Sequence, residues 1–269
     1  MKKKVLILGA NGMLGRDVYY FFKKKNNFKT FGSIRKKNKN YIKFDIKVDS
    51  LNKLKNFDFI INCTGIIKPR IKKNYLEAIL INTFFPLKLS DYCKKNKIKL
   101  IHITTDCVFS GHKGNYDERS DHDALDEYGK TKSLGEPDNC MVIRTSIIGE
   151  EKKNKYSLIE WLKKNKNGNV NGFSDHIWNG FTTKYLALII YQIILKNLFV
   201  EKKVHLYAKN KITKYNLLKL INDKLNLNIN IKKIKSKNKI DRSLNSIHKN
   251  YLNKYKNISY KKMINNHLI

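Results

Sequence analysis

A tyrosine and a lysine four residues apart, Tyr128 and Lys132, are the residues of this chain best suited to proton transfer. Side chains four apart on a helix share one face, so the phenol and the ammonium would lie together. A cation beside a phenol lowers the pKa of the phenol toward neutral pH, which lets it donate or accept a proton. The spacing alone is a weak signal, because it arises by chance in a chain so rich in lysine.

A glycine-rich turn far upstream gives this pair its context. Gly9, Gly12 and Gly15 follow an apolar run and precede a helical pattern. Such a turn lets the backbone approach a pyrophosphate, which the positive end of the helix stabilises. The spacing is one residue wider at its start than the commonest dinucleotide motif, and a packing turn without a ligand is the alternative. We expect cofactor contacts from Gly9, Asn11, Gly12, Met13, Leu14 and Gly15.

Short β-rich runs alternate with helical patterns through the first 150 residues, which predicts an α/β fold with a Rossmann-type doubly wound parallel sheet. The expected strands are Lys4–Leu8, Lys29–Ile34, Tyr41–Phe44, Phe57–Asn62, Lys99–Thr104 and Met141–Arg144. The expected helices are Met13–Lys25, Tyr75–Lys95 and one that contains Tyr128–Leu134.

A small mixed lobe is expected after Gly149. Its predicted helices are Leu158–Leu162, Tyr185–Leu195 and Lys214–Lys224, and its predicted strands are Val204–Tyr207 and Ile229–Ile234. Residues 168–180, with three glycines, are expected to form a loop. We expect residues 1–150 to be an NAD(P)-binding domain and residues 151–269 a substrate-binding lobe whose elements are interleaved with it. The crevice between them would be the site.

The ends of the predicted strands suggest which cofactor is used. Strand two lacks the acidic residue that holds a ribose 2′-hydroxyl in many NAD-binding proteins. Ser33, Arg35 and Lys36 would instead complement a 2′-phosphate, so NADPH is expected. NADH stays open, because basic residues occur throughout the chain. Further cofactor contacts are expected from Asp45, Ile46, Cys63, Thr64 and Gly65, with a solvated loop acid as the alternative for Asp45.

Strand five ends in polar residues. Thr105 would place a hydroxyl within reach of the Tyr128 phenol and orient a substrate oxygen for proton transfer. Asp106 is interpreted as an acceptor that anchors the following loop. His102, inside the strand, is expected to be a core histidine with satisfied hydrogen bonds.

Three motifs in this region identify a resemblance: Thr104–Gly111, Gly114–Glu118 and the segment from Tyr128 to Glu136. They resemble the extended short-chain dehydrogenases/reductases and, within that superfamily, dTDP-4-dehydrorhamnose reductases and their sugar-nucleotide relatives. The resemblance continues over Arg144–Ser146, Trp178–Thr183 and Asp241–Ser246, so it spans nearly the whole chain.

The resemblance implies an NAD(P)H-dependent reduction of the 4-keto group of a nucleotide-linked 6-deoxysugar, for the synthesis of dTDP-rhamnose or another cell-surface polysaccharide precursor. It implies a catalytic triad of Thr105, Tyr128 and Lys132, and cofactor contacts from Asn82, Thr104, Tyr128 and Lys132. It implies substrate contacts from Thr105, Asp106, Val108, Phe109, Tyr128, Asn179, Thr182 and Arg242. Arg242 is followed by serine, where the family commonly has proline.

Two alternatives stay open. One is a sugar-nucleotide epimerase or dehydratase that holds NAD, although such enzymes usually carry an acid after strand two and a larger second lobe. The other is a non-catalytic, cofactor-binding regulatory relative, although such proteins typically lose the tyrosine or the lysine of the triad. This chain keeps both residues.

Composition limits the partners. The net charge of +34 would suggest a nucleic-acid binder, but the lysines are scattered along all 269 residues rather than gathered in one segment. We expect no nucleic-acid partner, and a positive field that steers anionic ligands. The four cysteines form no metal-binding pattern and indicate a reducing cytoplasm. No signal peptide or membrane span is expected, and the sequence is compatible with a homodimer.

Overall fold

The computed structural model describes residues 1–152 and 155–268, and its largest element is a seven-stranded sheet in which every pairing is parallel. The strand order is β11-β6-β5-β4-β1-β2-β3. The strands are β1 (Lys4–Leu8), β2 (Lys29–Ile34), β3 (Ile42–Lys43), β4 (Phe59–Asn62), β5 (Lys99–Thr105), β6 (Met141–Thr145) and β11 (Lys203–His205). The order reverses between β1 and β4, where such folds bind ligands. The predicted Rossmann-type sheet is confirmed.

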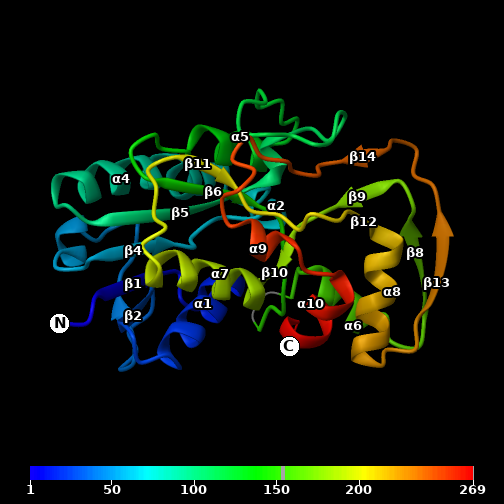
Figure 1. Ribbon diagram of the computed structural model, residues 1–269, viewed down its shortest axis with the longest axis horizontal. Helices are drawn as coiled ribbons and strands as arrows, with labels where there is room; N and C mark the ends of the chain where they lie inside the picture. The colour runs from blue at the N-terminus through cyan, green and yellow to red at the C-terminus, as the bar shows by residue number, and fades with distance from the viewer. Residues whose placement is uncertain (153–154, 269) are drawn as a thin grey trace.

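Helices cover both faces of this sheet (Figure 1). On one face α1 (Met13–Lys23) and α7 (Thr183–Leu195) pack against strand residues such as Ile7 and Ile101. On the other face Leu89 of α4 (Phe85–Lys95) packs near Leu6 and Leu100. The strands are continuous apolar runs because both faces are covered.

The helix predicted at Tyr75–Lys95 forms as three consecutive parts. These are α3 (Tyr75–Ile79), a π-helical turn η2 (Leu80–Phe84) and α4. Pro86 has no N–H to donate to the carbonyl of Asn82, so the regular α-helical ladder is interrupted there. The carbonyl of Asn82 lies against Gly135, which follows the helix that carries Tyr128, where a Cβ would overlap it. The interruption therefore serves close packing of the two helices.

A smaller part of the molecule lies at the right of Figure 1. Here β8 (Asn169–Phe173) pairs in parallel with β13 (Asn230–Ile234), and α8 (Lys214–Leu225) packs against β8. A second small sheet joins β9 (His176–Trp178) to β12 (Ile212–Thr213) and β14 (Ile240–Asp241).

The predicted loop at residues 168–180 is wrong, because the segment contains both β8 and β9. Gly172 lies inside β8, and a Cβ on it would sit 2.9 Å from the ring of Tyr215 and 3.0 Å from Ile231. This glycine therefore permits close packing against α8 and β13 and does not break the strand.

The second half of the chain contributes to both parts of the molecule, since β11 and α7 belong to the main sheet. The remaining paired strands are β7 (Ile147–Ile148) and β10 (Phe181–Thr182). The remaining helices are α2 (Lys68–Ile71), α5 (Glu127–Leu134), α6 (Leu158–Lys164), α9 (Asn253–Lys256) and α10 (Tyr260–His267). Over residues 1–152 and 155–268, none of the helices is both long and apolar enough to cross a bilayer.

Candidate functional site

The glycine turn has the geometry that a pyrophosphate site needs. Gly9 follows β1 with φ of +75°, which only glycine adopts readily. Its carbonyl accepts a hydrogen bond from the N–H of Gly12 at 2.9 Å. A Cβ on Gly15 would overlap that same carbonyl, so the third glycine lets α1 approach β1. Gly12 begins α1 without a side-chain cap, which leaves the positive end of this helix available to an anion.

Arg35, just beyond the end of β2, lies in a cluster of cations. Its Nη1 is 3.6 Å from Oε1 of Glu77, and Nζ of Lys47 is 2.8 Å from the same oxygen. Nη2 of Arg70 is 4.0 Å from Oε2 of Glu77. The hydrogen bond from Lys47 is the largest cause of the lowered pKa of Glu77. The roles of Lys47, Arg70 and Glu77 in this cluster could not be predicted from the sequence, because the three residues lie on separate segments. Lys36 is exposed nearby, and Ser33 is buried.

The ends of β3 and β4 carry local hydrogen bonds. Asp45 accepts from the N–H of Lys47 at 3.0 Å, so its carboxylate shapes the loop that holds Lys47 and Ile46. Thr64 donates its hydroxyl to Asn62 at 2.6 Å, and its methyl group would lie 3.1 Å from a Cβ on Gly9. The turns after β1 and β4 therefore touch, beside Cys63 and Gly65.

Asn82 joins the segment after β4 to helix α5. Its amide accepts from the N–H of Ile66 at 2.8 Å, donates to the carbonyl of Ile66 at 3.0 Å and donates to Oγ1 of Thr131 at 3.1 Å. Each of these partners is buried, so the bonds are protected from water. The structure thus shows Asn82 fixing the position of α5. A contact with the cofactor stays a prediction.

Helix α5 brings Tyr128 to the end of β5. Asp126 caps the helix by accepting from the N–H of Gly129 at 2.9 Å, and it pairs with Nζ of Lys68 at 2.5 Å. A Cβ on Gly129 would overlap the carbonyl of Cys107, so glycine allows the helix to touch the loop after β5. In this arrangement the Tyr128 phenol lies near enough to Thr105 for the threonine hydroxyl to influence the pKa of the phenol.

The predicted lowering of the Tyr128 pKa by Lys132 is wrong in this structure. Burial raises the pKa of the phenol, Cys107 and Asp106 add to the rise, and the hydrogen bond with Thr105 opposes it. Lys132 is 3% exposed and donates from Nζ to the carbonyl of Ile103 at 3.2 Å. Burial lowers the pKa of this ammonium to about 8, against the opposing influence of Glu136 and Cys63. Tyr128 is therefore protonated at neutral pH and can donate a proton.

The end of β5 gathers polar groups around Thr105. Its Oγ1 donates to Asp106 at 3.1 Å and accepts from the N–H of Cys107 at 3.1 Å. Burial raises the pKa of Asp106, and the nearby Arg242 opposes that rise. Nε of Arg242 donates to the carbonyl of Phe109 at 2.8 Å. The structure thus brings Arg242, from the far end of the chain, to the loop that follows β5.

The interpretation of His102 as a fully satisfied core histidine is wrong. Its Nδ1 lies 3.1 Å from Nδ2 of Asn62, but its Nε2 has no partner among the residues that the structure describes. Oγ1 of Thr104, two residues along the same face of β5, is also buried without a partner in that part of the chain. Burial lowers the pKa of His102 well below its usual value, so the ring is neutral.

The other predicted substrate contacts have buried side chains. Val108 and Phe109 lie in the interior, and Phe109 stacks on Tyr116 with ring centres 4.3 Å apart. Asn179 exchanges two hydrogen bonds with the backbone of Leu244, at 2.8 and 2.9 Å. Thr182 caps α7. In the structure these four side chains pack in the interior, bond to the backbone or cap a helix. Their contact with a substrate stays a prediction.

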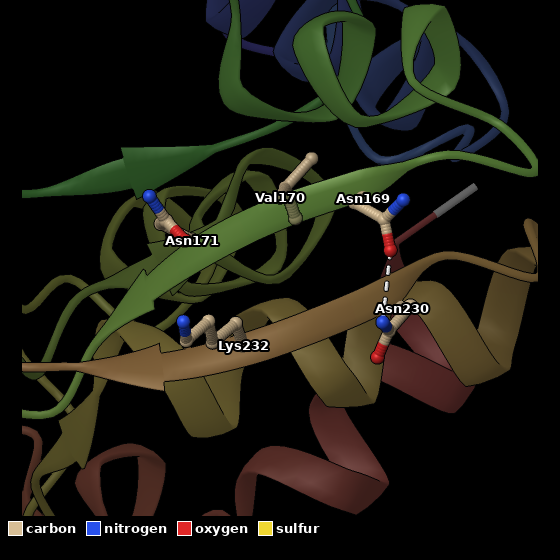
Figure 2. A pocket seen from close by; sticks show the side chains of 5 residues that line it. All are labelled: Asn169, Val170, Asn171, Asn230 and Lys232. Carbon is tan, nitrogen blue, oxygen red and sulfur yellow. Dashed lines mark hydrogen bonds between the residues drawn. The ribbon is translucent and has the colours of Figure 1, made fainter.

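Two surface hollows lie elsewhere. One, of about 270 Å³, is lined by residues of β8 and β13, namely Asn169, Val170, Asn171, Asn230 and Lys232 (Figure 2). Another, of about 520 Å³, lies between the start of the chain and the end of α7. Neither is lined by a residue of the predicted site. The candidate site is defined by the polar groups that converge at the end of β5.

Comparisons with known proteins show what the chain as a whole is similar to. A family model described as the RmlD substrate binding domain matches residues 2–256. Methionine adenosyltransferase 2 subunit beta from Bos taurus is 27% identical over 250 residues, which cover 84% of this chain and 73% of that protein.

Solved structures share the fold over nearly the full chain. A dTDP-4-dehydrorhamnose reductase from Clostridium acetobutylicum is similar with a TM-score of 0.79 and 20% identity, and 97% of each chain is covered. A dTDP-4-dehydrorhamnose reductase from Bacillus anthracis, solved in complex with NADP, has a TM-score of 0.76 and 20% identity, with 96% of this chain and 95% of that chain covered.

Proposed function

The chain belongs to the RmlD substrate binding domain family, and from that premise we propose that it is a sugar-nucleotide reductase. Its reaction would be the NADPH-dependent reduction of the 4-keto group of a nucleotide-linked 6-deoxysugar, such as the precursor of dTDP-rhamnose. One observation carries the proposal: Tyr128 lies near Thr105 at the carboxyl end of β5, and Lys132 of the same helix reaches the backbone of β5 at Ile103. In folds of this kind, the carboxyl edge of the sheet is where ligands bind.

Each of the three residues would have its own role in the reaction. The bound nicotinamide cofactor would supply the hydride. Tyr128, kept protonated by its burial, would give its proton to the oxygen of the ketone as charge develops there. Thr105 would donate a hydrogen bond to the same oxygen. Lys132, largely cationic at neutral pH because its pKa is about 8, would donate hydrogen bonds to the ribose hydroxyls next to the nicotinamide of the bound cofactor.

The fold supports a division of binding between the two halves of the chain. The Gly9–Gly15 turn and the free start of α1 suit a pyrophosphate, so residues 1–150 would hold most of the cofactor. Residues 151–269 would supply most of the sugar-nucleotide contacts, with Arg242 facing the diphosphate. A guanidinium suits that role because it can meet two phosphate oxygens in one plane.

Charge at the end of β2 favours NADPH over NADH. Arg35, Lys47 and Arg70 contribute three positive charges and Glu77 one negative charge, so the cluster has a net charge of +2. A 2′-phosphate near neutral pH carries close to two negative charges and would neutralise it. A ribose 2′-hydroxyl would leave the cations uncompensated. We therefore propose that this cluster binds the 2′-phosphate.

A second function is favoured by one comparison. The relative that is 27% identical is named as a subunit of methionine adenosyltransferase 2, which suggests a cofactor-binding subunit of a larger assembly. The retained Tyr128 and Lys132 favour the reductase, because a subunit without catalysis has no need of a proton donor and a buried ammonium on one helix.

The test is an assay of NADPH oxidation with a panel of dTDP- and UDP-linked 4-keto-6-deoxysugars. The reductase proposal expects turnover of at least one sugar, and no turnover by Tyr128→Phe. Tight NADPH binding without oxidation in the presence of any sugar would contradict the proposal and support the subunit function.

A further inference from the structure

Two segments far apart in sequence bind each other along their length beside the candidate site. We name residues 109–118, which follow β5, the β5 loop, and residues 241–247 the strap. The N–H of Asp241 donates to the carbonyl of Gly111 at 2.7 Å, and the N–H of Asn245 donates to the carbonyl of Tyr116 at 2.7 Å. Tyr116 donates in turn to the carbonyl of Ser243 at 3.0 Å. The strap is thus paired with the loop in the manner of a short parallel strand.

Glycines in the β5 loop permit this close pairing. Gly111 and Gly114 have φ of +95° and +71°, in the left-handed region that favours glycine. A Cβ on Gly111 would lie 2.9 Å from the side chain of Ile240 and 3.0 Å from that of Arg242. A Cβ on Gly114 would overlap the carboxylate of Asp241. The loop is therefore shaped to accept the strap.

Glu118 anchors the end of the strap. Its Oε1 accepts from the hydroxyl of Ser246 at 2.6 Å, and its Oε2 accepts from the N–H of Ile247 at 2.8 Å. Oε1 also accepts from the N–H of His205 at 2.9 Å. One carboxylate therefore joins the β5 loop, the strap and strand β11, and ionised oxygens form the stronger class of hydrogen bond.

The ring of His205 makes a second anchor. Its Nδ1 lies 2.9 Å from the carbonyl of Asn245 and 3.1 Å from that of Tyr116, so Nδ1 must carry the proton. Nε2 is then free to accept from Nη1 of Arg144 at 3.2 Å. Burial lowers the pKa of His205 to about 4, so this neutral tautomer persists at neutral pH. Arg144 is itself held by three contacts with the carboxylate of Glu136.

The strap carries Arg242 to the catalytic end of β5. Nε of Arg242 donates to the carbonyl of Phe109, and the charge of Arg242 acts on Asp106 and Cys107, the two residues after Thr105. A long side chain on an untethered segment would sample many positions, at a cost in entropy on binding. The anchors remove that freedom before a ligand arrives.

We propose that Glu118 and His205 are positioning residues for substrate binding: by fastening the strap to the β5 loop, they hold the Arg242 guanidinium where it meets the diphosphate of a sugar nucleotide. The proposal rests on the proposed function, and it adds two residues that touch no substrate themselves. It also explains why the motifs Gly114–Glu118 and Asp241–Ser246 occur together in one chain.

A double-mutant cycle tests the coupling. Arg242→Ala is expected to raise KM for the sugar nucleotide by roughly 10- to 100-fold, as expected for a lost charge-assisted hydrogen bond. Glu118→Gln should raise KM by about 5- to 20-fold, with kcat and the Kd for NADPH changed less than about twofold. In the Arg242→Ala background, Glu118→Gln should have no further effect on KM. Additive effects would overturn the proposal, since Glu118 would then act independently of Arg242.

Two further variants keep the test decisive. Ser246→Ala removes one hydrogen bond to Glu118 but keeps the carboxylate itself. This variant should raise KM for the sugar nucleotide by about 2- to 5-fold. Asp58→Asn is the matched control, because that carboxylate also accepts from a backbone N–H, that of Lys4, at the opposite edge of the sheet. The control should leave KM unchanged. An equal rise in KM for Asp58→Asn would show that loss of stability alone explains the effect.

Calorimetric binding of dTDP and UDP to the NADPH-loaded protein separates this proposal from the proposed function. If no sugar is reduced but Glu118→Gln still weakens dTDP or UDP binding through Arg242, the strap proposal stands and the reductase proposal fails. If sugars are reduced and Glu118→Gln changes neither KM nor nucleotide binding, the strap proposal alone fails. If the protein neither reduces a sugar nor binds either nucleotide, both fail.

Discussion

The two sides of the candidate site are built in different ways. The proposed pyrophosphate site uses consecutive residues of one turn, Gly9 to Gly15, between adjacent elements. The proposed substrate side assembles Phe109, Glu118, His205 and Arg242 from segments that meet only in the folded chain. The first is fixed by local backbone conformation, and the second depends on long-range hydrogen bonds. Substitutions should therefore separate cofactor binding from substrate binding.

The largest expected effect lies where the two sides meet. Tyr128→Phe removes the proton donor and should lower kcat by about 10²- to 10⁴-fold, because general acid catalysis contributes that much. The Kd for NADPH, measured by fluorescence titration, should stay within about twofold of the wild type, because the substitution keeps the aromatic ring and removes only the hydroxyl. A variant that kept more than half of the activity would remove Tyr128 from this role.

The stability of the substrate side should depend on acid pH. Between the ordinary pKa of a histidine, near 6.5, and the folded value of about 4, His205 binds fewer protons in the folded state than in the unfolded state. The free energy of unfolding should therefore fall as pH is lowered through this window, by about 1–3 kcal/mol from this residue. Denaturation in urea at a series of pH values measures it. His205→Gln should have a flatter profile between pH 4 and 6.5, and an unchanged profile would contradict the assignment.

A pair of glycine substitutions contrasts the two sides directly. Gly15→Ala places a methyl group against the carbonyl of Gly9 and should weaken NADPH binding by about 1–3 kcal/mol. Gly114→Ala, with φ of +71°, displaces Asp241 and should raise KM for the sugar nucleotide by a similar free energy. Each variant should leave the other ligand nearly unaffected. If both variants weakened both ligands equally, the two sides would not be separable.

The smallest expected effect concerns the choice of cofactor. Arg70→Ala should weaken NADPH binding by about 1 kcal/mol, which is less than the roughly 1.5–3 kcal/mol of a hydrogen bond to a charged group, because the side chain is partly exposed. NADH binding should not change. Lys95→Ala, which removes an exposed cation at the end of α4, is the control and should affect neither cofactor. A loss of affinity for both cofactors with Arg70→Ala would place its role outside 2′-phosphate recognition.

The sequence predicted the main sheet well because its signals are local. The bounds of β1 and β2 agree with the predicted runs, since continuous apolar stretches mark strands covered on both faces. The prediction for residues 168–180 was wrong because it also relied on a local signal, the glycines that are typical of a loop. The partners that make β8 a strand, β13 and α8, lie much later in the chain.

The candidate site was only partly predictable. Tyr128 and Lys132 were predicted from their spacing and Thr105 from its place at the end of a strand, and the structure brings Tyr128 near Thr105. The direction of the Tyr128 pKa could not be found that way, because it depends on burial and on where Lys132 points. Lys47 and Arg70 gave no local signal in a chain with 56 lysines and arginines. Glu118 and His205 are separated by 87 positions, and only the folded chain shows that both residues bind the same strap.

Transfer of a labelled hydride tests the central claim most directly. The protein would be incubated with a nucleotide-linked 4-keto-6-deoxysugar and with NADPH carrying deuterium at the transferable position of the nicotinamide. Mass spectrometry and NMR of the product should then show one deuterium on C4 of the sugar, and Tyr128→Phe should form almost none of this product. Recovery of the unreduced ketone, with the labelled NADPH bound but not consumed, would contradict the account.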